Sequence, residues 1–392
     1  MRVTNASTYR NYTSGVNNVH LSLNKSFNKI SSGKAYEAAK DSPLSYYEGK
    51  RIDNQFLDTQ SKLTLLQDVR NRVYQQEVGV RNIHTILSGD QGAKNRIRYA
   101  RTATTTGAAL ESAKLDLLQK QHEIVDSLNM QYQDYYIYGG NDHSTRPFTL
   151  SEDGKTLTYT HKFPGDATAS TVTMELKEKT TGDGYEFQIT GASSPSLGND
   201  GEKILAAAMK EQGRVDVGYG SIFERGTLLD TYTGGLNVLT GVTSDAIKEW
   251  TGNGGTTDAN GKGIMDYLNK SALTLVGQAV QAIDKYQTDE AAGNGDRDTM
   301  SKILGDTIET MTETEQTLST AYSDLGNKYH LMDNTEERLN SISDSLKVQY
   351  QDIMGADPYA SIMEMFSNQY AYNASLQIGS KLMGSSLFDF MS

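Results

Sequence analysis

The sequence predicts a mainly α-helical protein, in which a long coiled-coil-like helical bundle is formed from both chain ends and carries a β-rich inserted domain. Three observations lead to this prediction. A heptad repeat of apolar residues occupies the last third of the chain, and two proline-free helical stretches occupy the first third. The region between them is rich in glycine and threonine, a composition typical of strands and turns.

Residues 1–43 are predicted to form an N-terminal assembly arm. Their apolar residues recur at three- and four-residue steps, which is one face of an amphipathic helix: Val16, Val19, Leu23, Phe27 and Ile30. The helix is expected to end at Ser31–Lys34, and Asp41-Ser42-Pro43 resembles a helix cap followed by a first-turn proline. So thin an apolar face makes the isolated arm only marginally helical in water.

Residues 44–138 are predicted to form the N-terminal half of a helical rod, because they lack proline and return to helical spacing. One set of apolar residues fits a first seam: Ile52, Phe56, Leu63, Leu66, Val73, Val80, Ile83 and Leu87. After Ser88-Gly89-Asp90 a second helical stretch follows, with its own set: Leu110, Ala113, Leu117, Ile124 and Leu128.

Residues 139–290 are predicted to form an inserted β-rich or mixed domain. Of the 36 glycines, 21 lie between Gly139 and Gly263. Three segments alternate or are β-branched, and an antiparallel sheet is expected there: 156–161, 170–177 and 185–190. Helices are expected near 202–211 and 265–286, with a loop at 258–263.

Residues 291–354 are predicted to form the C-terminal half of the rod, on one helix. We call the apolar residues at every seventh position the rod seam: Leu304, Met311, Leu318, Leu325, Met332, Leu339, Leu346 and Ile353. We call the positions four residues later the mixed edge: Ile308, Glu315, Tyr322, Tyr329, Glu336, Ser343 and Tyr350. A seam of this length needs partner helices of similar length, which favours a rod over an ordinary compact bundle.

Residues 355–392 are predicted to form a C-terminal assembly arm. Its apolar face contains Ile362, Phe366, Leu376, Met383 and Leu387. Residues 1–40 hold six Lys and Arg against Glu37 alone, whereas residues 300–392 hold five Lys and Arg against thirteen Asp and Glu. The two ends are therefore electrostatically complementary, which favours their association.

Composition excludes several classes of function. The net charge of −12 argues against general nucleic-acid binding, and the absence of cysteine excludes disulfides and thiolate metal sites. We expect no membrane span, and because no apolar signal-peptide core is seen, any export is expected to use a route without a cleaved signal.

We predict no catalytic, cofactor-binding or metal-binding residue. The six histidines form no ligand pair, and the His122-Glu123 string has Asp126 where a zinc protease needs a second histidine. The glycines at 218 and 220 lack a third in register, and the Asp258 loop lacks a closing glutamate. The basic cluster at 94–101 is interpreted as a solvated or salt-bridged helix face.

Three motifs resemble one family. Residues 23–34, Leu-Asn-Lys-Ser-Phe-Asn-Lys-Ile-Ser-Ser-Gly-Lys, followed by Ala-Ala-Lys-Asp-Ser-Pro at 38–43, resemble the N-terminal signature of bacterial flagellins. Residues 136–148, Tyr-Ile-Tyr-Gly-Gly-Asn-Asp-His-Ser-Thr-Arg-Pro-Phe, resemble the segment that closes the N-terminal helices in hook-associated members of that family. The C-terminal residues 374–391 are also more similar to those members than to flagellin itself.

The resemblance implies an extracellular structural subunit of the flagellum. It implies chain termini that pair as helices on assembly, a ring-like homo-oligomer at the hook–filament junction, and export by the flagellar type III apparatus. The implied partners are other copies of the chain, hook-associated protein 1 on the hook side, flagellin on the filament side and a cytosolic export chaperone. No cofactor, nucleic acid or membrane is implied.

Three alternatives remain open from the sequence. The chain could be flagellin itself, although the segment around Gly139-Gly140 favours a junction subunit. It could be a secreted enzyme with its site in residues 141–280, although such insertions usually show a metal motif. A cytosolic coiled-coil binding module is the third alternative.

Overall fold

The computed structural model describes residues 5–102, 106–180, 182–211, 213–215, 229–230 and 233–388. The chain divides into two compact units. The first comprises residues 1–63 and 337–392, and the second comprises residues 64–336. The chain is mainly helical and carries a small inserted sheet, so the predicted fold class is confirmed.

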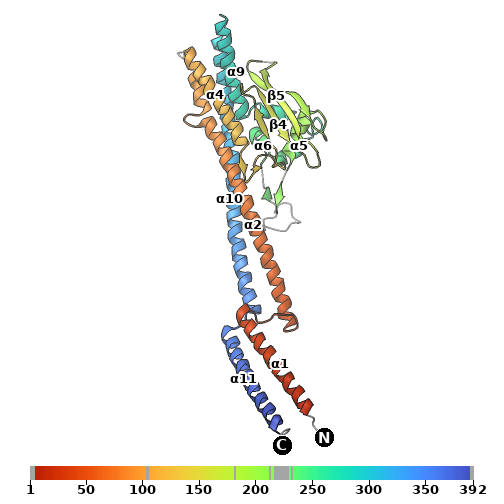
Figure 1. Cartoon of the computed structure of the whole chain (residues 1–392). Coiled ribbons are helices and arrows are strands. Elements are labelled where there is room, and N and C mark those ends of the chain that lie inside the picture. The colour runs from red at the N-terminus through yellow and green to blue at the C-terminus, as the bar shows by residue number, and fades with distance from the viewer. Residues whose placement is uncertain are drawn as a thin grey trace. The chain divides into compact units, whose positions relative to one another are not determined.

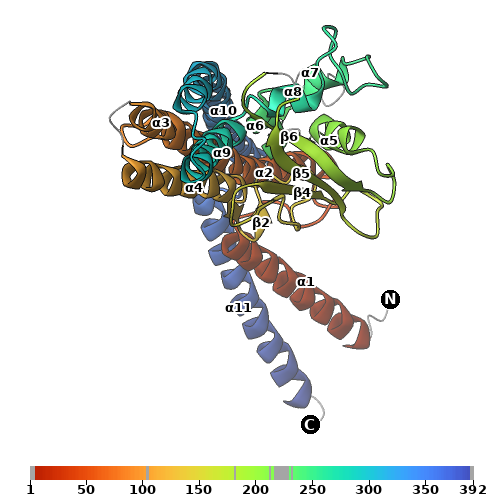
Figure 2. The ribbon, with the colours of Figure 1, turned by 90° about the horizontal axis from the view of Figure 1, so that it is seen from above.

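The first unit contains both chain ends. Helix α1 (Asn5–Ser32) pairs with α11 (Pro358–Phe388). The two lie next to each other in Figure 1, and Figure 2 shows them diverging toward the two chain ends. Gly33 ends α1 with a φ of 68°, in the left-handed region that glycine enters without cost. A backbone bridge then joins Lys34 to Gly355, so the segments that lead out of α1 and into α11 are held together.

The same unit contains the first part of α2 (Pro43–Ser88) and the last part of α10 (Arg297–Met354). Pro43 is the first residue of α2, as the cap-and-proline signal predicts. Gln60 donates a 2.9 Å hydrogen bond to Ser343, and the ammonium group of Lys347 lies 5.8 Å from the Phe56 ring centroid. These contacts pair the two helices in antiparallel directions.

The second unit combines helices with the inserted sheet. Helix α3 (Ala93–Arg101) packs on α4 (Gly107–Leu128), and α4 packs along α9 (Ala272–Ala291). Residues 64–88 of α2 and 297–336 of α10 complete the helical part. Fully buried side chains from all of these helices fill its core: Leu66, Val80 and Leu87; Ile97; Leu117, Ile124 and Leu128; Val276 and Ile283; Leu304 and Met311.

The sheet is an antiparallel meander of four strands, ordered β3 (Phe148–Leu150), β4 (Thr156–His161), β5 (Ser170–Glu178) and β6 (Tyr185–Ser193). Burial alternates along β4 and β5, so that one face is buried and mostly apolar and the other carries threonines. Helices α5 (Gly201–Lys210) and α9 pack against the sheet, as Figure 2 shows. The three predicted strands and the helix near 202–211 are found within a few residues of their expected positions.

Short elements connect the sheet to the helices. They are the hairpin of β1 (Gln131–Tyr132) and β2 (Tyr135–Tyr136), the pair β7 (Arg214–Val215) and β8 (Leu229–Asp230), and helices α6 (Gly235–Thr240), α7 (Ser244–Lys248) and α8 (Ile264–Leu268). The hairpin lies where helical spacing was expected to continue to Tyr138. The single helix expected over 265–286 is divided, because Ser271 caps the first turn of α9 by accepting from Thr274 N–H.

Candidate assembly surface

Several polar contacts join α1 to α11. Tyr12 donates a 3.1 Å hydrogen bond to the Ser375 carbonyl, and Asn368 donates one of 2.8 Å to the Ser26 hydroxyl. Lys29 forms a 2.9 Å ion pair with Glu364. As the α1 residue number rises, the α11 number falls, so the helices are antiparallel.

The charge on α1 has one sign. Helix α1 contains no acidic residue, and its cations include Lys25 and Lys29. Lys25 forms a 2.7 Å ion pair with Asp41, whose hydrogen bond from the ammonium lowers the pKa of the Asp41 carboxyl. Lys29 thus pairs across the two chain ends, as their complementary charges suggest, whereas Lys25 pairs within the N-terminal arm. Exposed ion pairs stabilise little, so charge alone does not explain the pairing.

The predicted assembly residues of α1 fall into two groups. Val16, Val19 and Leu23 are half-buried, on the part of α1 that contacts α11. Phe27 and Ile30 are exposed. This apolar face is therefore only partly covered within the chain, and the uncovered part lies toward the end of α1.

The predicted assembly residues of α11 are exposed wherever side chains are described. Ile362, Phe366 and Leu376 all face solvent. Met383 and Leu387 belong to the last turns of α11, and their side chains lie outside the described residues. Large apolar side chains of α11 thus remain exposed to solvent, although this helix is paired with α1. Exposed apolar surface of this kind is typical of interaction sites.

A second row of exposed residues on α11 was not predicted from the sequence. Tyr359, Met363, Phe366 and Tyr370 are 80 %, 59 %, 57 % and 79 % exposed. We call them the outer stripe. Only Phe366 was expected among them, because the predicted apolar face follows a single helical repeat on one side of the helix. The four-, three- and four-residue steps between these positions were a signal that the sequence did contain.

The rod seam is almost fully buried. In the second unit the buried members are Leu304, Met311, Leu318, Leu325 and Met332. In the first unit Leu339 and Leu346 are buried, and Ile353 is half-buried. Removing a Leu or Met side chain from water stabilises a fold by about 1.5–3 kcal/mol. The seam is therefore a structural element within each unit, and the exposed arms remain as candidate contacts.

The mixed edge of α10 has specific partners on α2 and α3. Within the second unit Glu315 forms a 2.8 Å ion pair with Lys94, and the Tyr322 ring stacks edge-on against His84 at 5.6 Å. The Tyr329 ring lies 5.9 Å from the Tyr74 ring. Successive mixed-edge residues contact different kinds of side chain. A shift of one helix by a heptad would therefore mismatch these pairs, so the mixed edge favours the observed alignment.

Arg70 on α2 is the centre of this polar edge. Its guanidinium binds Asp333 at 3.0 Å and also Glu336, and it lies 5.9 Å from the Tyr329 ring centroid. The side chain is mostly buried, where ionic contacts are less screened by water than at the surface.

The motif at residues 136–148 forms the joint between the helices and the inserted domain. Tyr138 is fully buried and donates a hydrogen bond of 2.5 Å to the Gln76 carbonyl on α2. Gly79 lies against the Tyr138 ring, where any Cβ atom would collide with the hydroxyl. The N–H of Asn141 donates to Glu211, which lies 3.2 Å from the buried His161 on β4. This motif therefore anchors the inserted domain.

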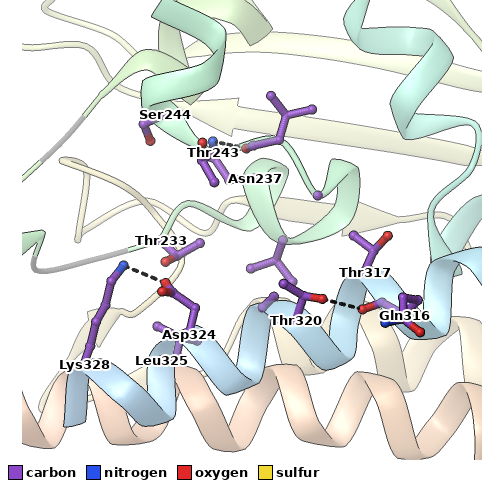
Figure 3. A pocket seen from close by; sticks show the side chains of 14 residues that line it. Thr233, Asn237, Thr243, Ser244, Gln316, Thr317, Thr320, Asp324, Leu325 and Lys328 are labelled. Atoms are coloured by element: carbon purple, nitrogen blue, oxygen red, sulfur yellow. Dashed lines mark hydrogen bonds and ion pairs between the residues drawn. The ribbon is translucent and has the colours of Figure 1, made fainter. Parts of the chain in front are cut away.

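A cavity of about 530 Å³ lies between the α6–α7 segment and α10 (Figure 3). Its described lining combines hydroxyl and apolar side chains, among them Thr233, Thr243, Thr320 and Leu325. At one end Lys328 forms a 3.1 Å ion pair with Asp324. No described side-chain nitrogen or oxygen in this lining is both deeply buried and without a hydrogen-bond partner.

Metal-binding and membrane-spanning features are absent from the described ranges. Within them, no group of three or more His, Asp or Glu side chains is placed to hold a metal ion. No described helix is long and apolar enough to cross a membrane.

Comparison with known proteins gives structural likeness only. No protein-family model and no curated protein sequence matches the chain. Solved structures that resemble it include a protein described as a flagellar hook-associated protein from Vibrio parahaemolyticus, with 10 % identity over 80 % of this chain and 100 % of that one, at a TM-score of 0.48. FlgL from Bacillus cereus has 11 % sequence identity over 77 % of this chain and 99 % of that one, at a TM-score of 0.41. Flagellar hook-associated protein 3 from Legionella pneumophila has 9 % sequence identity over 78 % of this chain and 98 % of that one, at a TM-score of 0.43.

Proposed function

We propose that this chain is a structural subunit of an extracellular bacterial appendage, the flagellum. Within that class we propose the role of hook-associated protein 3, which forms the junction layer between hook and filament. The flagellin-type motif at 23–43 and the hook-associated motif at 136–148 support the assignment, and the second motif favours a junction subunit over flagellin.

The observation that carries the proposal is the construction of the arms. Helices α1 and α11 are joined by polar contacts, while Phe27, Phe366 and Leu376 remain exposed. A monomer gains nothing from holding large apolar side chains in water, whereas an assembly gains stability in proportion to the apolar area that neighbouring copies cover. The arms, rather than a pocket, are therefore the functional site.

The domain organisation follows from this role. Arms 1–43 and 355–392 make the contacts between subunits, and segments 44–138 and 291–354 form the rod that carries them. The inserted domain, 139–290, is held on the rod by the 136–148 joint. The proposed partners are copies of the chain, hook-associated protein 1, flagellin and a cytosolic export chaperone. The proposed role is structural and involves no catalytic step and no cofactor.

Localisation and function can be tested together in flagellated cells. Immunogold labelling of the chain is expected to give one narrow band at the base of each filament. Phe366→Asp places a charge on the arm and is expected to abolish incorporation, so that flagellin is released into the medium. Lys29→Ala, on the same helical pair, removes one partly exposed ion pair and is expected to leave filaments intact.

The outcome can be interpreted only if both variants fold. Circular dichroism of the purified chains serves as that control, because Phe366 is exposed and its replacement should leave the helical content unchanged. Normal filaments on cells that carry Phe366→Asp, or label distributed along the whole filament, would contradict the proposal.

A further inference from the structure

Helix α10 borders two adjacent cavities of the second unit. The larger is the cavity of about 530 Å³ described above, and a smaller one of about 240 Å³ continues along the helix toward Glu313. Gly241 and Thr317 line both cavities, and a Cβ atom at position 241 would collide with the Thr317 methyl group. From Glu313 to Lys328 the cavities follow α10 for about 22 Å, at about 1.5 Å per residue.

The charged side chains of the lining are paired with one another. Lys328 forms a 3.1 Å ion pair with Asp324 at one end, and Lys270 forms a 3.4 Å ion pair with Glu313 at the other. An ammonium group has three N–H donors and a carboxylate accepts several hydrogen bonds, so each pair can also bind ligand groups. Since the charges cancel within each pair, the cavities suit a neutral ligand rather than an ion.

Hydroxyl groups of α10 supply hydrogen-bond acceptors between these two ends. Thr317 donates its own hydroxyl hydrogen to the Glu313 carbonyl, and Thr320 donates to the Gln316 carbonyl. Each hydroxyl oxygen therefore offers lone pairs to a ligand but has no hydrogen left to donate. Figure 3 shows Thr317 and Thr320 on the side of α10 that faces the α6–α7 segment. A ligand that fits here must bring donors of its own.

Apolar surface lies beside these polar groups. The larger cavity is lined by Val238, Val242 and Leu325. The smaller cavity is lined by Tyr267, whose hydroxyl donates a 2.7 Å hydrogen bond to Asp258. A side chain that is already held in place loses little entropy when a ligand binds. The ligand therefore needs apolar surface as well as hydrogen-bond donors.

We propose that the two cavities form a binding site for a neutral oligosaccharide. Sugar hydroxyls both donate and accept, so they match the threonine oxygens and the paired charges, while the C–H faces of the sugar rings cover the apolar lining. An extended peptide fits less well. The described lining comes from helices and the loops next to them, so it provides no strand edge to pair with a peptide backbone.

This inference concerns the second unit alone and is independent of the arm contacts. The test applies the labelled full chain to an array of neutral oligosaccharides of glucose, galactose or mannose, acidic oligosaccharides and extended peptides. Calorimetric titration then gives the affinity for the strongest neutral binder. Asp324→Ala is expected to weaken that binding roughly tenfold, the effect of losing a hydrogen bond to a charged group. Thr320→Trp is expected to abolish it, because the indole ring occupies the cavity.

The matched control for Thr320→Trp is Thr312→Trp. Thr312 is also exposed on α10 and donates the same kind of hydrogen bond, to the Ile308 carbonyl, but it lines neither cavity. This variant should bind like the parent chain, and circular dichroism checks that both tryptophan variants fold. Three outcomes would overturn the inference: no binding to any neutral oligosaccharide, tighter binding to an acidic oligosaccharide or a peptide, or equal affinities of the two tryptophan variants.

Discussion

Tyr12 on α1 lies directly against Gly379 on α11. The Tyr12 hydroxyl donates to the Ser375 carbonyl, and a Cβ atom at position 379 would collide with that hydroxyl. Gly379 is therefore a point of close approach between the two arms. A glycine inside a helix lowers helix stability by about 1 kcal/mol relative to alanine. The close approach of Tyr12 is a physical reason for a glycine at this position.

Gly379→Ala is expected to reduce protection of the α1 backbone, measured by hydrogen exchange over residues 5–32. The hydroxyl of Tyr12 must move, and a net contribution of about 1 kcal/mol from its hydrogen bond is lost. Gly15→Ala is the matched control, since a Cβ atom there meets nothing within 4 Å. That change should increase protection through helix propensity alone. Equal gains in both variants would show that Tyr12 is not held against position 379.

Leu325→Asp is expected to destabilise the second unit by several kcal/mol, because it places an unpaired charge at a position that is only 2 % exposed. Calorimetry of the purified chain should show a clearly lower melting temperature. Asn327→Asp adds the same charge to an exposed position two residues away and should change little. If the two variants have the same melting temperature, the rod seam is not buried in solution.

Arg70 and Glu336 are expected to be energetically coupled. We expect a double-mutant cycle of Arg70→Met and Glu336→Gln to give a coupling free energy of about 1–3 kcal/mol, as for residues that share one ionic network. The measurement is chemical unfolding of the four chains. Asp333 also binds Arg70, so Glu336→Gln alone should cost less than Arg70→Met. Additive effects of the two changes would contradict a shared network.

Asp142 is expected to contribute stability that disappears in acid. Burial alone would raise the pKa of its carboxyl, but hydrogen bonds from Thr145, Ser144 and the Lys162 N–H outweigh burial and hold the pKa below the usual value. A lowered folded-state pKa stabilises the fold above the unfolded-state value of about 3.9, and that stability is lost as pH falls through the folded-state pKa.

The test of Asp142 is the difference in melting temperature between the parent chain and Asp142→Asn as a function of pH. The difference is expected to be largest near neutral pH and to shrink as pH falls below about 4. Asp90→Asn, at an exposed position, serves as the control. A difference that stays constant across this range would mean that the charge of Asp142 does not contribute.

The arms are expected to be cleaved before the rod. Limited proteolysis of the monomer, followed by mass spectrometry, should cut within residues 1–40 and 358–392 first and leave the second unit intact. Polar contacts and half-buried side chains give the arms little to offset the entropy of ordering them. Arms that survive as long as residues 64–336 would show that assembly is not needed to stabilise them.

Local sequence signals predicted much of the fold. Alternation of polar residues with Leu157, Val172 and Phe187 indicates strands with one buried face, and the structure confirms them. Gly33 marks the end of α1 because glycine permits the left-handed conformation found there, and Pro43 marks the start of α2 because proline fixes φ at a helical value. The heptad repeat of the rod seam indicates one long helix, and α10 extends this helix before the repeat, to Arg297.

Other features depend on contacts that no local pattern encodes. The hairpin at 131–136 turns through Gln133 and Asp134, both with positive φ, and neither residue is a strong turn signal like glycine. The partners of the mixed edge come from α2 and α3, which are distant in the sequence. Taken alone, Tyr329 and Glu336 are polar interruptions of an apolar helix edge, and only the fold shows that Arg70 contacts both. The outer stripe has helical spacing in the sequence, but its exposure depends on which face of α11 is paired with α1.

The bridge between Lys34 and Gly355 has a consequence for the order of folding. It closes a loop that contains nearly the whole chain, and contacts between such distant residues form late because the loop-closure entropy must be overcome first. Residues 64–336 are contiguous and can fold as soon as they are available. The first arm, although it is synthesised first, must wait for the last residues of the chain before α11 can pair with it.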